Sequence, residues 1–222
     1  MSEQRSPTQR RLSVGASTTP GEVLVPRAAV DFSERCPDVE LDVRIADTEE
    51  IVAALKGREV EVAVVGRDVD DPSLQSRVLE QDQLVLVVAA SSELAGSELH
   101  PDDLAGLPFV MREEGSATRR AAEEALAAAG QEPKVAMELG SNTAVVAAVA
   151  EGAGLVGVVP ARQLGEDRRV GRLHVRGLSL RRPFVLLRER GRTLSDAAEA
   201  FVAVLTGRED LELVRPGRRQ GC

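Results

Sequence analysis

Residues 11–66, RLSVGASTTPGEVLVPRAAVDFSERCPDVELDVRIADTEEIVAALKGREVEVAVVG, predict strand, helix, strand, helix and strand in series. Apolar side chains occupy every second position over residues 39–45, which is typical of a strand. The helix before this strand places Leu24, Ala28 and Phe32 on one face and ends at Pro37. Because helices connect the strands through short loops, the segment predicts a parallel sheet with right-handed crossovers.

Two short segments indicate where the helices of this unit begin. Thr19-Pro20-Gly21-Glu22 matches a capping box with proline at the first helical position. Residues 47–50, DTEE, carry the same capping chemistry ahead of IVAALKG, and Gly57 suits the end of that second helix. We therefore expect one helix to begin at Thr19 and the other at Asp47.

A second α/β unit follows the first. Strands are predicted at residues 83–92, 106–111, 134–139, 154–160, near 173 and at 182–190, and helices at residues 102–105, 118–129, 142–152 and 194–207. The chain has two places to cross between units, within residues 67–82 and near Arg182. We expect subdomain I at residues 11–86 and 187–207, subdomain II at 87–186, a disordered tail at 1–10 and a flexible tail at 208–222.

Composition excludes several classes of protein. The 222-residue chain carries a net charge of −8, no Trp or Tyr and four Phe, which disfavours non-specific nucleic-acid binding and base stacking. It contains no run of about 18 apolar residues and no apolar signal segment at its start, so we expect a cytoplasmic protein outside the membrane. Cys36, Cys222, His100 and His174 are too dispersed to predict a disulfide or a metal site, and no cofactor is expected.

Three predicted strand-to-helix junctions share a small, polar composition. They are Gly15-Ala-Ser-Thr-Thr19, Gly115-Ser-Ala-Thr118 and Gly140-Ser-Asn-Thr143. The first turn of a helix offers unpaired N–H groups and a positive dipole end, so converging junctions of this kind form an anion site. Ser, Thr and Asn are also the ordinary helix caps, and capping alone explains any one junction.

Charged residues near these junctions give weaker signals. Arg119 lies in the first turn of its helix, where it opposes the dipole and has no obvious local partner, and it would suit a bound carboxylate or simply be solvated. The adjacent acids Glu113 and Glu114 favour a solvated loop over paired catalytic carboxylates. Neither a nucleophile elbow nor a P-loop occurs, and we predict no catalytic residues.

Taken together, these segments resemble the effector-binding domain of LysR-type transcriptional regulators over about residues 11–207. LSVGASTTPGEVLV, FVMREEGSATRRAAEEAL, MELGSNTAVVAAVAEGAGLVGVVP and RRPFVLLRERGRTLSDAAEAFVAVL follow the family pattern in order. The resemblance implies the type-2 periplasmic-binding-protein fold, with two α/β subdomains joined by two crossing strands and a small effector in the cleft. The effector-site residues that it implies are Ser17, Thr18, Thr19, Gly66, Gly115, Ser116, Thr118, Ser141 and Asn142, with Gly66 on the opposite wall and Arg119 as an added candidate.

The resemblance also carries expectations about partners. Family members begin with a winged helix-turn-helix that this sequence does not contain, so we expect either an excised piece or a chain without its DNA-binding domain. DNA binding is then a property of the full-length parent. The resemblance implies a homodimer, or a tetramer in the parent, for which the helices at 21–35 and 119–129 are candidate surfaces, although both also suit the core.

We therefore predict a domain that binds a small anionic effector. A transport solute-binding protein would carry a signal peptide or lipoprotein cysteine, and an enzyme of this fold would need an acid–base or nucleophile pair. The sequence contains neither pattern.

Overall fold

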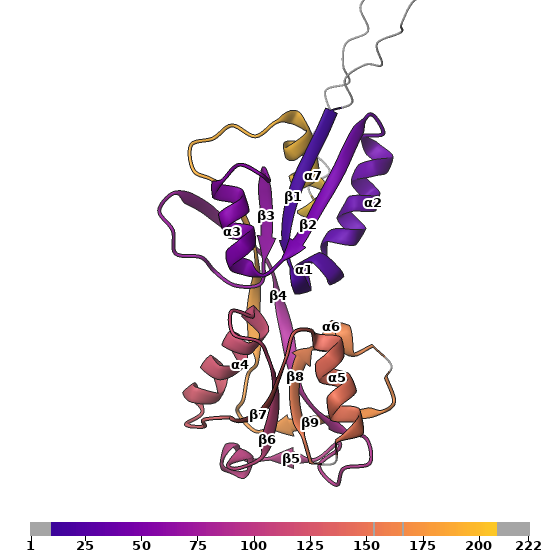
Figure 1. Ribbon diagram of the computed structural model, residues 1–222, viewed down its shortest axis with the longest axis vertical. Helices are drawn as coiled ribbons and strands as arrows, with labels where there is room; N and C mark the ends of the chain where they lie inside the picture. Colours follow the sequence, from indigo (N-terminus) through magenta and orange to yellow (C-terminus); the bar gives the residue numbers. More distant parts are fainter. Residues whose placement is uncertain (1–9, 153, 166, 208–222) are drawn as a thin grey trace, which may run out of the picture.

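The computed structural model describes residues 10–152, 154–165 and 167–207. Two α/β lobes are stacked along the long axis of the molecule and joined at a narrow waist (Figure 1). Apart from Arg10, which begins the first strand, the two predicted tails lie outside the described residues. No helix in the described part of the chain is long and apolar enough to cross a membrane.

The first lobe contains the unit predicted from residues 11–66. Its elements are β1 (Arg10–Ser17), α1 (Thr18–Val23), α2 (Val25–Arg35), β2 (Val39–Ala46), α3 (Thr48–Lys56), β3 (Val62–Val65) and α7 (Asp196–Leu205). β1 pairs in parallel with both β2 and β3, which confirms the predicted parallel sheet. The rings of Phe32 and Phe201 meet edge to face at 5.6 Å and join α2 to α7 in the core of this lobe.

The second lobe is built in a similar way. Its elements are β5 (Glu98–Leu99), the 3-10 turn η1 (Pro101–Leu104), β6 (Pro108–Arg112), α4 (Ala117–Ala128), β7 (Lys134–Leu139), α5 (Asn142–Glu151), β8 (Val156–Pro160), α6 (Ala161–Leu164) and β9 (Val170–Val175). β6 pairs in parallel with β7 and β8. Phe109, Met111 and Leu126 are among its largest fully buried side chains.

Two long strands connect the lobes. β4 (Leu74–Ala89) and β10 (Arg181–Glu189) run antiparallel through the waist, with Arg182 opposite Asp82 (Figure 1). The strand order β2-β1-β3-β10-β4-β8-β6-β7 therefore continues from one lobe into the other. The fold is the expected two-lobed α/β architecture. The predicted subdomain limits at 86/87 and 186/187 fall inside these strands, and the exact division stays a prediction.

Two local predictions were wrong. α1 begins at Thr18 directly after β1, and its N-cap Ser17 makes no side-chain capping bond, so the capping box predicted at Thr19 does not form. By contrast, Asp47 caps α3 as predicted by accepting a hydrogen bond from the Glu50 N–H at 2.8 Å. The strand predicted from residue 83 begins at Leu74, because the chain stays extended while it crosses the waist.

Candidate functional site

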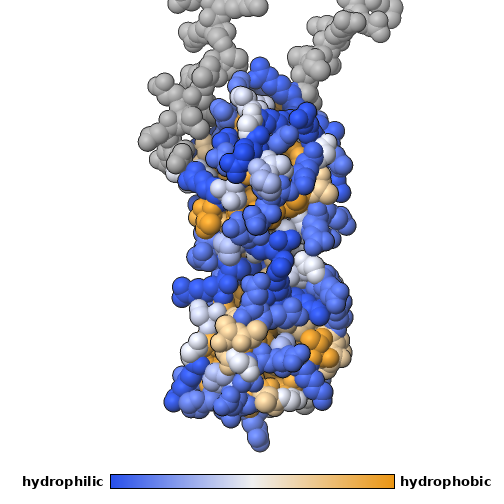
Figure 2. Space-filling view, turned by 90° about the vertical axis from the view of Figure 1, so that its left-hand side faces the viewer, coloured by the Kyte–Doolittle hydropathy of each residue, from blue (hydrophilic) through white to orange (hydrophobic). Residues whose placement is uncertain are grey.

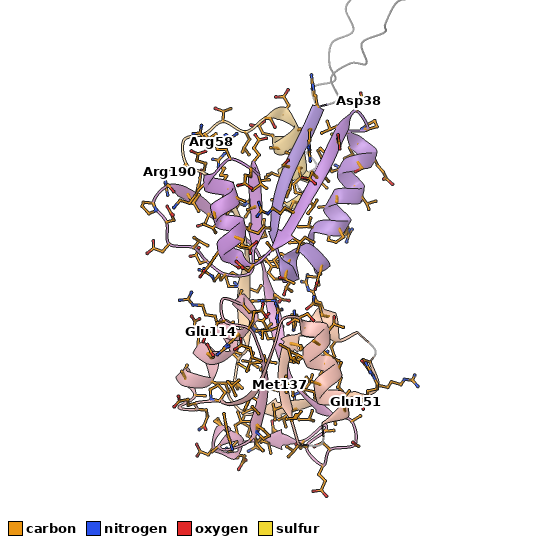
Figure 3. The ribbon with its side chains drawn as sticks, viewed as in Figure 1. Asp38, Arg58, Glu114, Met137, Glu151 and Arg190 are labelled. Atoms are coloured by element: carbon orange, nitrogen blue, oxygen red, sulfur yellow. The ribbon has the colours of Figure 1, made fainter. Side chains whose placement is uncertain are left out.

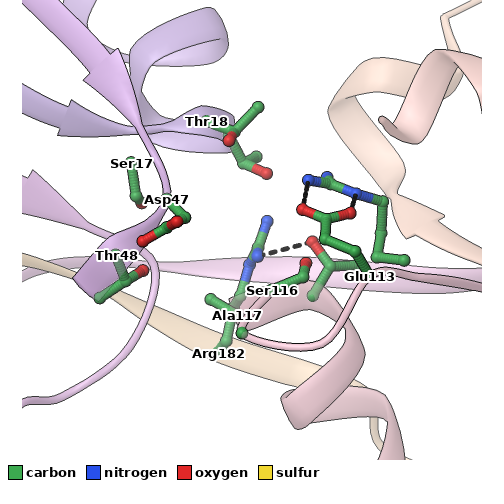
Figure 4. Close-up of a pocket in the computed structure, with 12 residues that line it drawn as sticks. Ser17, Thr18, Asp47, Thr48, Glu113, Ser116, Ala117 and Arg182 are labelled. Carbon is green, nitrogen blue, oxygen red and sulfur yellow. Dashed lines mark hydrogen bonds and ion pairs between the residues drawn. The ribbon is translucent and has the colours of Figure 1, made fainter. Parts of the chain in front are cut away.

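The waist holds a polar cleft between the two lobes. Its lining residues are Ser17, Thr18, Thr19, Asp47, Thr48, Arg112, Glu113, Gly115, Ser116, Ala117, Thr118 and Arg182. Figure 4 shows Ser17, Thr18, Asp47 and Thr48 on the first-lobe wall, facing Glu113, Ser116 and Arg182. Residues of the waist are mostly hydrophilic on the face in Figure 2. The cleft therefore suits a polar ligand.

Two helices begin at opposite walls of the cleft. α3 starts at Thr48 on the first lobe, and α4 starts after Ser116 on the second. Within the described residues, the hydroxyl groups of Thr48 and Ser116 make no hydrogen bond. The cap of α3 is Asp47 and not Thr48, and Ser116 precedes α4 without making a capping bond to it. Each wall thus offers a free hydroxyl beside a helix N-terminus, which attracts negative charge.

The three hydroxyls of the first junction are already engaged. Ser17 Oγ accepts a hydrogen bond from the Gly66 N–H at 3.0 Å. Thr18 Oγ1 lies 3.5 Å from the Ala46 carbonyl, to which it donates, and Thr19 Oγ1 accepts from Asn142 Nδ2 at 3.4 Å. These bonds fix the wall, and Thr19 also ties the first lobe to the second.

Arg182 lies at the centre of the cleft on the crossing strand β10. Its Nε and Nη2 both donate to Asp82 Oδ2 at 3.0 Å, and Nη1 donates to Thr118 Oγ1 at 2.8 Å. Burial lowers the pKa of Arg182 against the opposing effect of Asp82, and burial raises the pKa of Asp82 against the effect of Arg182. Both directions have one cause, which is removal of the charged pair from water.

Arg112, the last residue of β6, brings a second guanidinium to the cleft. Its Nε and Nη2 each donate to one carboxylate oxygen of Glu113 at 2.7 Å. Partial burial raises the pKa of Glu113, but the hydrogen bonds from Arg112, a backbone hydrogen bond and the positive charges of Arg112 and Arg119 together hold that pKa below its usual range. Glu113 is therefore ionised at neutral pH, and the Arg112–Glu113 pair is a full ion pair.

The cleft is narrow in this structure. The space between its lining side chains is about 20 Å³, which is room for about one water molecule. On the outer side, Gly115 and Ser116 also border a wider hollow of about 400 Å³ with Glu49, Arg67, Glu114, Arg119, Arg120 and Glu123. A ligand larger than water therefore needs the side chains or the lobes to move.

The structure gathers most of the predicted site residues at the waist. Ser17, Thr18, Thr19, Gly115, Ser116 and Thr118 line one cleft, as expected from converging junctions. Gly66 is close behind it, where a Cβ would lie 3.3 Å from both Ala117 and Arg182.

The remaining predicted residues have structural partners. Ser141 caps α5 by accepting from the Ala144 N–H, and Asn142 bridges Thr19 and Gln163. Arg119 pairs with Glu123 and Glu138, so the expectation that it has no local partner was wrong. Its guanidinium is engaged with carboxylates in this structure.

Sequence reasoning missed the cleft arginines Arg112 and Arg182 and the partner Asp82, and it expected Glu113 in a solvated loop, whereas Glu113 pairs with Arg112. Arg182 and Asp82 are separated by 100 residues and become neighbours only through the antiparallel pairing of β4 and β10. A usable signal was the position of Arg182 beside the apolar run PFVLL of a crossing strand, because an arginine buried with that run requires a partner. No group of three or more potential metal ligands occurs among the described residues.

Comparison with known proteins agrees with this architecture. The family model for the LysR substrate binding domain matches residues 5–209. The HTH-type transcriptional regulator CbbR of Rhodospirillum rubrum is 30% identical over 197 residues, which are 87% of this chain and 65% of that protein. The regulatory domain of CcmR from Synechocystis PCC6803, solved in complex with 2-PG, has a TM-score of 0.81 at 25% identity and covers 90% of this chain and 97% of that one.

A relative of a different name matches the same region. The phosphonates import ATP-binding protein PhnC of Anaeromyxobacter dehalogenans (strain 2CP-C) is 35% identical over 199 residues, 87% of this chain and 40% of that protein. The present sequence contains no GxxxxGK[ST] phosphate-binding loop. The chain spans less than two thirds of the length of PhnC and of CbbR. With a family match over nearly its whole length and a polar cleft between two α/β lobes, the chain belongs to the family of LysR substrate-binding domains.

Proposed function

We propose that the chain binds a small anionic effector in the cleft and acts as the sensing domain of a cytoplasmic LysR-type transcriptional regulator. The observation that supports it best is the convergence of Arg112 with the free hydroxyls of Thr48 and Ser116 at two helix N-termini. Guanidinium, hydroxyl and helix-terminal N–H groups all donate to an anion. Carboxylates, phosphates and sulfur oxyanions fit this donor set, and the domain performs no reaction on them.

Effector binding would change the relation between the lobes. Thr48 and Ser116 lie on opposite walls, so an anion held by both favours one separation of the lobes over others. β4 and β10, which pair as they cross the waist, would transmit the change. In a full-length parent, this change would reset the spacing of attached DNA-binding domains.

We propose that the domain forms a homodimer through the ends of its strand order. β2 and β7 are the terminal strands, and β7 is exposed along most of its length. Exposed apolar side chains occur on or beside these strands, at Val30, Ile45, Val135 and Met137 (Figure 3 labels Met137). Unpaired edges with apolar residues favour association, and an antiparallel dimer would cover the first-lobe edge with the partner's second-lobe edge.

Titration calorimetry tests the effector proposal. The wild-type chain is titrated with sulfate, inorganic phosphate, 2-PG, which is the ligand named with the CcmR domain, and a panel of small carboxylates. We expect at least one to bind, and Thr48→Ala combined with Ser116→Ala to weaken it about tenfold or more, because each lost hydrogen bond contributes about 1 kcal/mol. Absence of binding across the panel, or an unchanged affinity in the double variant, contradicts the proposal.

Sedimentation velocity on the same sample tests the dimer proposal, which predicts the mass of two chains.

A further inference from the structure

We infer that Glu113 is a built-in competitor of the effector, which occupies Arg112 in the empty cleft and must leave when an anion binds. The inference rests on the proposed function and identifies the group that the anion replaces. It begins from the contact itself, in which both Glu113 carboxylate oxygens accept from Arg112 at 2.7 Å (Figure 4). That two-oxygen contact is the one that a carboxylate, phosphate or sulfate ligand makes with an arginine.

The local backbone places Glu113 in this position. Neighbouring residues of a strand point to opposite faces, so Arg112 and Glu113 would diverge if β6 continued. β6 ends at Arg112, and the chain turns at once through a hydrogen bond from the Ser116 N–H to the Glu113 carbonyl. Gly115 has a φ of 86°, which favours glycine, and completes this turn. The turn therefore brings the Glu113 carboxylate back onto the guanidinium beside it in sequence.

Glu113 differs from the other carboxylates around the cleft. Asp47 is held as the cap of α3, and Asp82 is fully buried against Arg182. The Glu113 side chain is 34% exposed, while that of Arg112 is 3% exposed. Glu113 can thus rotate into solvent and have its own charge hydrated, whereas Arg112 stays buried and then needs another anionic partner.

Space and charge both require the exchange. An ion can make a two-oxygen contact with Nε and Nη2 of Arg112 only where the Glu113 carboxylate now lies, and the space of about 20 Å³ in the cleft leaves little room elsewhere. Exchange of one anion for another also keeps the charge around Arg112 balanced. A neutral ligand could not take over this ion pair, so Glu113 would restrict the cleft to anions.

Sulfate and 2-PG titrations of Glu113→Gln at fixed ionic strength test the inference. Gln keeps the length of the side chain and removes the charge that holds Arg112. We expect Glu113→Gln to bind about two- to fivefold more tightly than the wild type, because a partly exposed ion pair is worth about 0.5–1 kcal/mol. Glu114→Gln is the matched control, since Glu114 is exposed at the outer hollow (Figure 3) and should change affinity less than twofold.

The outcomes separate this inference from the proposed function. The inference is overturned if Glu113→Gln binds no more tightly than the wild type, or if Glu114→Gln tightens binding as much as Glu113→Gln does. In either case, binding by the wild type would still support the effector site. If neither the wild type nor Glu113→Gln binds any probe, both ideas are wrong. A crystal structure with sulfate gives a second measurement that does not depend on the variants. Sulfate on Arg112 with Glu113 rotated outward supports the inference, and an intact Arg112–Glu113 pair overturns it.

Discussion

The two arginines of the cleft have opposite surroundings. Arg182 on β10 is held between Asp82 of β4 and Thr118 of α4, and both members of its ion pair are almost completely buried. Arg112 is equally buried, but its carboxylate partner lies on a turn and is partly exposed. The Arg182–Asp82 pair therefore holds the two crossing strands together, while in the Arg112–Glu113 pair the Glu113 side chain can leave its partner.

The difference suggests a division of roles. A buried ion pair resists separation, because either charge alone in the interior lacks both water and a counter-ion. Arg182 further packs over the Phe184 ring at 5.6 Å, which restricts it more. We therefore expect Arg182 to set the geometry of the waist and Arg112 to receive the ligand.

The largest expected effect is on stability at the Arg182 pair. Asp82→Leu leaves a buried guanidinium without its carboxylate and should lower the free energy of unfolding by about 3–5 kcal/mol, measured by urea denaturation. Adding Arg182→Leu removes the stranded charge, and the double variant should recover most of that loss. Additive losses in the double variant would show that the pair does not act as a unit.

The next effect is on ligand affinity at Arg112. Arg112→Ala should weaken binding of sulfate or 2-PG by about 10- to 100-fold, because it removes a charge-assisted contact worth about 1.5–3 kcal/mol. Calorimetry measures the change, with Arg120→Ala as control because the Arg120 side chain is exposed and paired with Glu124. A similar loss in both variants would mean that net charge, and not the Arg112 contact, governs binding.

Local sequence patterns predicted much of the architecture. Apolar alternation in residues 39–45 and the helical spacing of Leu24, Ala28 and Phe32 correspond to β2 and to α2 with its N-cap, because each pattern places most of its apolar side chains against the core. The Asp47 cap was also predictable, since it depends on residues three positions apart. The Arg119–Glu123 pair obeys the same local logic and was overlooked.

The contacts of the charged cleft residues depend on strand pairing and on where strands end, which short sequence patterns do not show. Asp82 meets Arg182 only when β4 and β10 pair, which no short-range pattern encodes. Arg112 and Glu113 are adjacent in sequence, yet their contact requires β6 to end between them. The wrong cap at Thr19 has a related cause, because β1 runs directly into α1 and Thr19 instead bonds Asn142 of the other lobe.

The smallest expected effect concerns pH and again separates the two pairs. The Arg112 hydrogen bonds depress the folded pKa of Glu113, so their stabilisation is present above the unfolded pKa and is lost only as pH falls through the lower folded value. Between about pH 6 and 8, Glu113 stays charged, and sulfate keeps a constant charge as well. The ratio of sulfate affinities of Glu113→Gln and wild type should therefore change less than twofold across this range in calorimetry. A ratio that varies with a midpoint near neutral pH would identify another titrating group at Arg112, and the simple exchange of Glu113 for the anion would then be insufficient.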